Sequence, residues 1–371
     1  MPIRRLAHFR LLPLLAACAG CPVQAAEPLA LESSSDMVVS AQHAASDVGA
    51  AILAQGGNAV DAAVAMGYAL AVTHPCCGNI GGGGFMTIHL AGGKDTFINF
   101  REKAPMAARA GMFLDAAGSP VAAKSRDGYL AVGVPGTVLG LETALQRYGT
   151  LPREALIAPA IRLAQQGFIL TPGDVAVFAE AAAALRAQPN VAAIFLDHGA
   201  SYGPGARLVQ KNLAATLRKI SDGGADAFYR GSIADAVVQS SRDHGGVLTK
   251  ADFEKYTVTE SVPISCTYRS YTVISAPPPS SGGVTLCEML QVLGGYDLRA
   301  LGRGSGETLH LMTEAMRYAY RDRNTYLGDP AFIDNPVARL LSPLHMQSIR
   351  GHIQPHRATP SAALGEETLI N

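Results

Sequence analysis

Apolar residues recur at helical spacing through most of the middle of the chain, and glycine or proline interrupts the pattern between segments. A cap at Ser46 is expected to open the first helix, which ends at Gly56-Gly57, and Asn58 caps the next. Pro159 is expected to begin a helix, because proline is favoured in the first turn. The helices predicted beyond the first are 59–72, 137–148, 159–166, 171–187, 212–220, 232–244, 250–256, 284–293 and 305–326.

Short apolar and β-branched runs predict strands at 37–40, 85–90 and 96–101, and a strand or hairpin at 264–275. The glycine-containing segment 91–95 predicts a hairpin turn. Large apolar residues alternate only loosely in the paired strands, which indicates a sheet covered on both faces. With no internal repeat and no clean boundary, we expect one domain of mixed α/β layers.

The first 26 residues have the pattern of a signal peptide. Arginines at positions 4, 5 and 10 precede a short apolar stretch, and Val23-Gln24-Ala25 has the small-x-small spacing of a cleavage site. We therefore expect a signal at 1–26, a domain at 27–371, and a periplasmic or secreted protein. A second interpretation is a lipoprotein box ending at Cys18, which would give a lipid-anchored envelope protein. Membrane attachment is expected only in that case.

Charge is balanced along the chain, with 30 basic and 30 acidic residues among 371 and no run of one sign. A nucleic-acid partner therefore has no electrostatic support. The glycine run 81–84 follows a helix and precedes a strand, which is the reverse of a phosphate-binding loop. We expect no nucleotide or other cofactor, and we expect these glycines to let two backbones pass closely.

The cysteines and histidines do not form a familiar metal motif. His74, Cys76 and Cys77 include possible zinc ligands, but adjacent cysteines lack the usual spacing and no second ligand pair follows. Partly buried thiols in a packed turn, and no metal site, are expected. Cys266 and Cys287 could form a disulfide in an oxidising compartment, which the sequence leaves open.

Two further segments are candidates for chemistry. Arg101 ends a predicted strand, where its guanidinium could clamp a carboxylate through two hydrogen bonds; the alternative is a solvated strand end paired with Glu102. The segment 277–283 contains two serines, but it lacks a G-x-S-x-G turn and a nearby histidine. We interpret it as a rigid proline segment that leads into a helix cap.

Seven segments, in order, resemble the signatures of the γ-glutamyltranspeptidase family, and the similarity covers about Met37 to Pro330. No single segment would suffice, but their order is highly specific. They are 56–65, Thr73-His74-Pro75, 78–86, 99–102 with 104–105, 134–137, 277–283, and 319–323 followed by 327–330.

The resemblance implies part of the four-layer αββα sandwich of the N-terminal-nucleophile hydrolases. In that family a precursor cuts itself into a large and a small subunit, and the new N-terminal threonine attacks the γ-glutamyl carbonyl of glutathione or a related donor. The glutamyl group then passes to an amino acid, a peptide or water. Arg101 matches the arginine that clamps the substrate's α-carboxylate. The glycine run and the segment 277–283 are implied to be architectural.

The chain departs from the family at its C-terminus. The family's Thr-Thr/Ser-His segment has no counterpart, since Thr368 is the last threonine and no histidine follows it. We therefore expect no catalytic residue in this chain, inactivity in isolation, and a large-subunit role beside a small subunit that supplies the threonine. The alternatives are an inactive remnant or a binder of γ-glutamyl compounds, and a relative of the β-lactam acylases.

Overall fold

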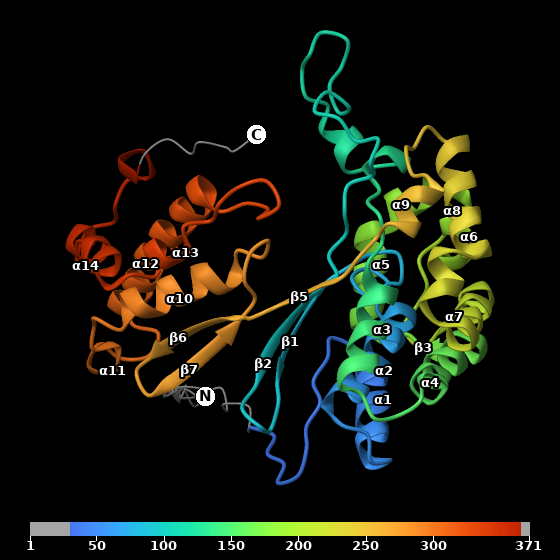
Figure 1. The fold of residues 1–371 in the computed structure, drawn as a ribbon, viewed down its shortest axis with the longest axis horizontal. Helices are drawn as coiled ribbons and strands as arrows, with labels where there is room; N and C mark the ends of the chain where they lie inside the picture. The colour runs from blue at the N-terminus through green and yellow to red at the C-terminus, as the bar shows by residue number, and fades with distance from the viewer. Residues whose placement is uncertain (1–29, 365–371) are drawn as a thin grey trace, which may run out of the picture. The chain divides into compact units, whose positions relative to one another are not determined.

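The computed structural model describes residues 30–364, so the predicted signal peptide and Cys18 lie outside the described residues. The chain divides into two compact units, Met1–Met37 and Val38–Asn371. Within the first unit, the described residues 30–37 form no helix or strand. All elements below belong to the second unit (Figure 1).

A layer of packed helices forms the first half of this unit. Helix α2 (Ala59–Thr73) lies at its centre and packs against α1 (His43–Ala54), α3 (Thr137–Tyr148) and α4 (Arg153–Gln166). Helix α7 (Lys211–Tyr229) packs on α4. Side chains on all sides of α2 are buried, as its apolar pattern predicts.

The start of α2 is fixed by a buried carboxylate. Asn58 and Asp61 form a capping box, and Asp61 also accepts hydrogen bonds from the amides of Thr150 and Leu151 and from the Thr150 hydroxyl. Burial opposes ionisation of Asp61, but these hydrogen bonds outweigh it and lower the pKa of the carboxyl. The cap predicted at Asn58 is confirmed, and it also ties α2 to the loop before α4.

A three-stranded antiparallel sheet in the order β1-β2-β5 leads into Arg101, which follows the end of β2. The predicted hairpin is present as β1 (Phe85–His89) and β2 (Asp95–Asn99), and β2 pairs on its other side with β5 (Thr259–Ser261). The central strand is buried throughout its middle, whereas Thr87 and His89 of edge strand β1 are exposed. The expectation of cover on both faces is therefore correct for β2 and wrong for β1.

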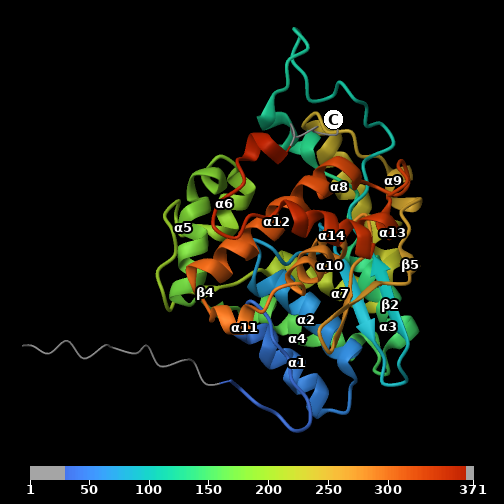
Figure 2. The same cartoon turned by 90° about the vertical axis from the view of Figure 1, so that its left-hand side faces the viewer.

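The C-terminal part of this unit consists of a hairpin and the helices that pack on it. Segment 264–275 forms the hairpin β6 (Ile264–Tyr268) and β7 (Tyr271–Ser275), and a disulfide from Cys266 to Cys287 joins it to α10 (Gly282–Leu293). Helices α12 (Gly306–Tyr326) and α14 (Pro343–His352) both pack on α10 (Figures 1 and 2).

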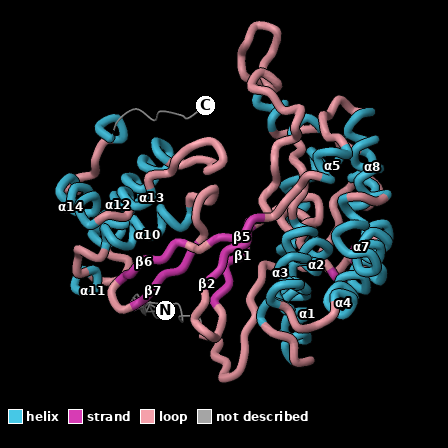
Figure 3. Tube along the Cα trace, in the orientation of Figure 1, coloured by secondary structure: helices cyan, strands magenta, loops and turns pink. Residues whose placement is uncertain are grey.

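Shorter elements complete the described chain. Between β2 and α3 only two 3-10 turns interrupt a long loop (Figure 3). The remaining elements are η1 (Ala122–Ser125), η2 (Tyr129–Ala131), β3 (Phe168–Ile169), α5 (Pro172–Arg186), α6 (Pro189–Phe195), β4 (Arg207–Leu208), α8 (Ser232–Asp243), α9 (Lys250–Glu254), α11 (Leu298–Leu301), α13 (Val337–Leu340) and η3 (Ser361–Leu364).

Several predicted boundaries are wrong. Residues 37–40 form no strand, and α1 begins at His43 with Gln42 as its cap rather than at Ser46. Pro159 lies inside α4, which begins at Arg153 after Pro152. Among the described residues, no helix combines the length and the apolar character needed to cross a bilayer.

Candidate functional site

The backbone that carries Arg101 is an extension of the β1–β2 ladder. The amide of Phe100 donates to the carbonyl of Gly84 at 3.0 Å, and the amide of Gly84 donates back to Phe100 at 3.2 Å. The Arg101 amide then donates to Asn99 Oδ1 at 3.0 Å, and the Tyr256 hydroxyl donates to the Arg101 carbonyl at 2.8 Å. The main chain of Arg101 is therefore held on both sides.

Glycines make this arrangement possible because other chains pass very close to the strand end. A Cβ at Gly83 would lie 2.6 Å from the Phe100 carbonyl oxygen, and one at Gly136 would lie 1.9 Å from the same atom. The amides of Gly136 and Thr137 both donate to the Gly82 carbonyl, at 2.7 and 3.0 Å. The close backbone passage predicted for the glycine run is confirmed.

The side chain of Arg101 has no charged partner. Its guanidinium carbon lies 5.9 Å from the centre of the Phe85 ring, and no residue from 30 to 364 forms an ion pair or a side-chain hydrogen bond with it. The ion pair with Glu102 that was the alternative interpretation is therefore not formed. An exposed guanidinium without a partner keeps its hydrogen-bond donors available for a ligand.

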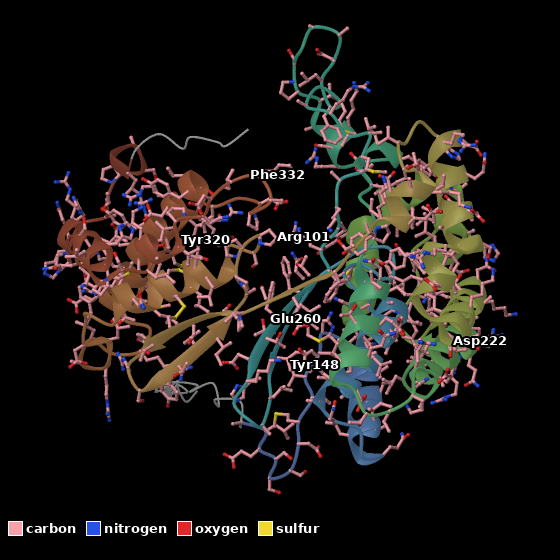
Figure 4. The ribbon with its side chains drawn as sticks, in the orientation of Figure 1. Arg101, Tyr148, Asp222, Glu260, Tyr320 and Phe332 are labelled. Atoms are coloured by element: carbon pink, nitrogen blue, oxygen red, sulfur yellow. A yellow bond between two sulfur atoms is a disulfide. The ribbon has the colours of Figure 1, made fainter. Side chains whose placement is uncertain are left out.

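Arg101 lines a cavity of about 1090 Å³ whose lining also includes Phe332, and Figure 4 labels both residues. The opposite wall comes from residues more than 170 positions later in the chain, including Ser280, Ser281, Arg323 and Phe332. Arg323 donates from Nε to Ser281 Oγ at 3.1 Å, which fixes the start of α10 against the end of α12. The lining carries Arg101, Lys103 and Arg323 against Glu102 and Asp329, and this excess of one positive charge favours an anionic ligand.

The segment 277–283 leads into a helix as predicted, but Pro278 and Pro279 form a turn with a cis peptide bond rather than a polyproline helix, and the Ser281 side chain makes no capping hydrogen bond. Ser281 is the N-cap residue of α10, and the helix begins at Gly282. Ser280 and Ser281 nevertheless lie in the wall of the Arg101 cavity, a position that an architectural interpretation alone did not predict. The described residues that line the cavity include no histidine to activate either serine.

A buried ionic cluster behind this wall was missed by the sequence analysis. His345 on α14 lies 2.5 Å from Asp322 Oδ2, and Arg321 Nη2 lies 2.7 Å from Asp322 Oδ1. Glu288 on α10 is 1% exposed, and neither of its carboxyl oxygens has a hydrogen-bond partner. Burial, and then the negative charge of Asp322, raise the pKa of Glu288 to about 9. This cluster joins α10, α12 and α14.

The free thiols differ from their prediction. Cys76 and Cys77 are exposed rather than partly buried, and the structure brings them together with His74. Their position in the turn after α2 separates them from the residues that line the Arg101 cavity.

The described lining of the cavity thus has positive groups that suit a carboxylate ligand, and it has no serine–histidine pair. Such a cavity can bind and orient a carboxylate, but acyl transfer also requires a nucleophile and donors for the developing oxyanion.

Comparison with known proteins agrees with this architecture. The chain is 52% identical over 349 residues to a glutathione hydrolase proenzyme of Pseudomonas sp. (strain A14), covering 94% of this chain and 61% of that protein. It resembles the solved γ-glutamyltranspeptidase of Helicobacter pylori with a TM-score of 0.88 and 42% identity, covering 91% of this chain and 98% of that one. A cephalosporin acylase from Bacillus halodurans matches with a TM-score of 0.76 and 29% identity, over 88% of this chain and 63% of that one.

These matches confirm the predicted fold class, the N-terminal-nucleophile hydrolase fold of mixed helices and sheets. The chain spans about three fifths of the length of the Pseudomonas relative. The family model described as "Gamma-glutamyltranspeptidase" matches residues 45–369, which is most of the sequence. The chain therefore belongs to the γ-glutamyltranspeptidase family, a family of enzymes.

Proposed function

We propose that this chain is the large-subunit part of a γ-glutamyltranspeptidase. In this proposal the enzyme transfers the γ-glutamyl group of glutathione or a related compound to an amino acid, a peptide or water. Arg101 binds the α-carboxylate of the γ-glutamyl group, and a threonine at the start of a small subunit supplies the nucleophile. No metal or cofactor takes part.

One observation supports the role of Arg101 above all. Its main chain is hydrogen-bonded on both sides, while its guanidinium lines a cavity and has no hydrogen-bond or ion-pair partner within residues 30–364. A planar guanidinium matches a carboxylate through two parallel hydrogen bonds, so it fixes both the position and the orientation of the bound group. Orientation matters because the γ-carbonyl must be presented to a nucleophile on another element.

The need for a small subunit follows from what the cavity lacks. Its described lining has two serines and no histidine, and the curated relative extends well beyond the region that this chain matches. We propose that a threonine hydroxyl, with its own α-amino group as the base, attacks the γ-carbonyl while Arg101 holds the other end of the glutamyl group.

A second candidate is acylase activity toward β-lactam side chains, supported by the likeness to the Bacillus halodurans cephalosporin acylase. A glutaryl group differs from a γ-glutamyl group by the loss of the α-amino group, and both carry the carboxylate that Arg101 would bind. The clamp therefore serves either substrate, and the contacts to the α-amino group decide between them.

Export is part of the proposal. The N-terminal arginines, the apolar stretch and the small-x-small sequence support a signal peptide and a periplasmic or secreted enzyme. Lipidation at Cys18 is the alternative, and mass analysis of the mature protein distinguishes a chain that begins near Ala26 from one that begins with a lipid-modified Cys18.

The test uses this chain co-expressed with a separate small subunit that begins with threonine. Hydrolysis of a γ-glutamyl anilide is measured for the wild type, for Arg101→Lys and Arg101→Gln, and for the exposed control Arg109→Gln. Loss of a charge-assisted pair costs about 1.5–3 kcal/mol, so KM should rise by about 10- to 100-fold in Arg101→Gln and less in Arg101→Lys. A KM unchanged in Arg101→Gln would refute the clamp.

Two other outcomes separate the alternatives. Activity on a glutaryl substrate together with none on the γ-glutamyl anilide would identify an acylase. No turnover of either substrate by any pair of chains would overturn the enzymatic proposal and leave an inactive remnant. Calorimetry with glutamate and glutathione would then decide whether that remnant still binds γ-glutamyl compounds.

A further inference from the structure

The turn that follows α2 brings together three side chains whose donor atoms suit a soft metal ion. His74 Nε2 lies 3.4 Å from Cys76 Sγ, and Cys76 Sγ lies 2.8 Å from Cys77 Sγ. All three donor atoms lie within 4.8 Å of one another. Adjacent cysteines lack the usual sequence spacing of zinc ligands, but the fold places the three donor atoms close together in space.

The turn is held by hydrogen bonds of its own backbone. The amides of Cys77 and Gly78 both donate to the His74 carbonyl, at 3.1 and 2.8 Å. Gly78 packs so closely on the last turn of α2 that a Cβ there would lie 2.6 Å from the Leu70 carbonyl oxygen. The three donors are therefore carried by a constrained segment rather than by a loose loop, which reduces the entropy that a ligand must overcome.

The cysteines are also accessible and unpaired. Cys76 and Cys77 are exposed, and they are the free cysteines of the described chain, since Cys266 and Cys287 form a disulfide. Exposed, adjacent thiols beside an imidazole have no packing role that would prevent them from rotating toward a ligand. Thiolate and imidazole donors together select borderline and soft cations such as Zn²⁺ over Mg²⁺ or Ca²⁺.

We propose that His74, Cys76 and Cys77 form a three-ligand binding site for Zn²⁺ or a similar thiophilic cation. Bond lengths of about 2.3 Å to sulfur and about 2.0 Å to nitrogen place tetrahedral ligands about 3.5 Å (N to S) and about 3.8 Å (S to S) apart. The His74–Cys76 separation already has the required value. The two sulfurs must separate by about 1 Å, which rotation of exposed side chains allows. The fourth position is left to water or to a ligand.

The test uses the full chain carrying Cys18→Ser and Cys21→Ser, so that thiols outside the turn do not contribute. Cd²⁺ is titrated in the presence of a non-thiol reductant, and thiolate coordination is followed by its ultraviolet charge-transfer band. Zn²⁺ is then added to displace Cd²⁺. We expect one Cd²⁺ per chain, a saturable band and complete displacement by Zn²⁺.

Variants assign the ligands. Mutations of residues that only support the ligands of a metal site weaken metal binding by about 10- to 100-fold. Removing a ligand should cost at least as much, so Cys76→Ser, Cys77→Ser and His74→Gln should each weaken binding by at least about tenfold. His43→Gln, at an exposed histidine on α1, is the matched control and should bind as the parent does. Because the substituted positions lie in an exposed turn, circular dichroism should confirm that every variant is folded.

Two results would overturn the proposal. One is the absence of a charge-transfer band at a molar excess of Cd²⁺. The other is a band that survives in the Cys76→Ser/Cys77→Ser double variant. A band that is lost in the cysteine variants but unchanged in His74→Gln would exclude the three-ligand site as stated.

Discussion

Replacing Glu288 with glutamine should stabilise the protein at neutral and alkaline pH. Glu288 is 1% exposed, and its carboxyl oxygens have no hydrogen-bond partner. Burial, followed by the charge of Asp322, raises its pKa from 4.5 to about 9. The folded protein therefore holds this side chain protonated at neutral pH, while the unfolded chain ionises it. Glutamine keeps the neutral form and a similar shape at every pH.

The sign and size of the effect follow from linkage. A carboxyl group whose pKa is raised by folding contributes stability that is fully present below pH 4.5 and is lost as the pH rises toward about 9. Each pKa unit corresponds to about 1.4 kcal/mol, so about three units between pH 4.5 and pH 7.5 set an upper limit of about 4 kcal/mol. Arg321 forms an ion pair with Asp322, and its positive charge offsets part of this loss of stability. We expect Glu288→Gln to gain about 2 kcal/mol at pH 7.5.

Urea denaturation of both proteins between about pH 5 and about pH 8.5 measures the difference in the free energy of unfolding. The difference should be small at the acid end and should grow steadily with pH. Glu180→Gln, at an exposed position on α5, is the control and should change stability by less than about 0.5 kcal/mol throughout.

The reasoning would be refuted by a glutamine variant that is less stable than the wild type across the whole range. That result would mean that Glu288 is ionised in the folded protein and pairs with His345, whose Nε2 lies 3.7 Å from Glu288 Oε1. A constant difference at all pH values would also refute it, because it would show that no proton is taken up on folding at this position.

Two further substitutions test how the site is supported. Asp61→Asn should lower the free energy of unfolding at pH 7 by about 1–3 kcal/mol, because an amide cannot accept all the hydrogen bonds that the carboxylate receives. Since folding lowers the pKa of Asp61, its contribution to stability is present above pH 3.8 and is lost as the pH falls through the lower pKa of the folded state. Urea titrations at two pH values measure this loss. Gly140→Ala should lower the melting temperature, because the new Cβ would lie 2.1 Å from the Phe100 ring and overpacking costs about 1–3 kcal/mol. Gly111→Ala, where a Cβ meets no neighbour, is the control, and equal melting temperatures for the two variants would contradict this account.

Features set by neighbouring residues could be predicted from the sequence. The cap at Asn58, the hairpin after the glycine run and the limits of α3 all depend on residues close together in the chain, and all three are observed. Pro159 shows where a local rule fails. Proline favours a first turn, but here the helix begins after Pro152 because burying Leu156, Ile157 and Ala160 makes a longer helix favourable.

Features made by distant segments could not be predicted in this way. The position of Arg101 at a strand end was predictable, but the wall that faces it comes from the segment before α10, the end of α12 and the loop that follows α12, and no local pattern indicates that contact. Likewise, His345 lies in a tail with weak periodicity, so nothing in its neighbourhood suggested a buried acidic partner on another helix. The spacing of Cys76 and Cys77 in the sequence argued against a metal site. It could not show how close their donor atoms lie, because that depends on the shape of the turn.

The way in which Arg101 is held has a consequence for how this position can change over evolutionary time. Its location depends on main-chain hydrogen bonds to Asn99 and Tyr256 and on glycines that pass beside Phe100, and none of these contacts uses the Arg101 side chain. Folding therefore places little constraint on which side chain occupies this position. Mutation can exchange the recognition group while the scaffold persists, so new ligand preferences can arise here without loss of stability.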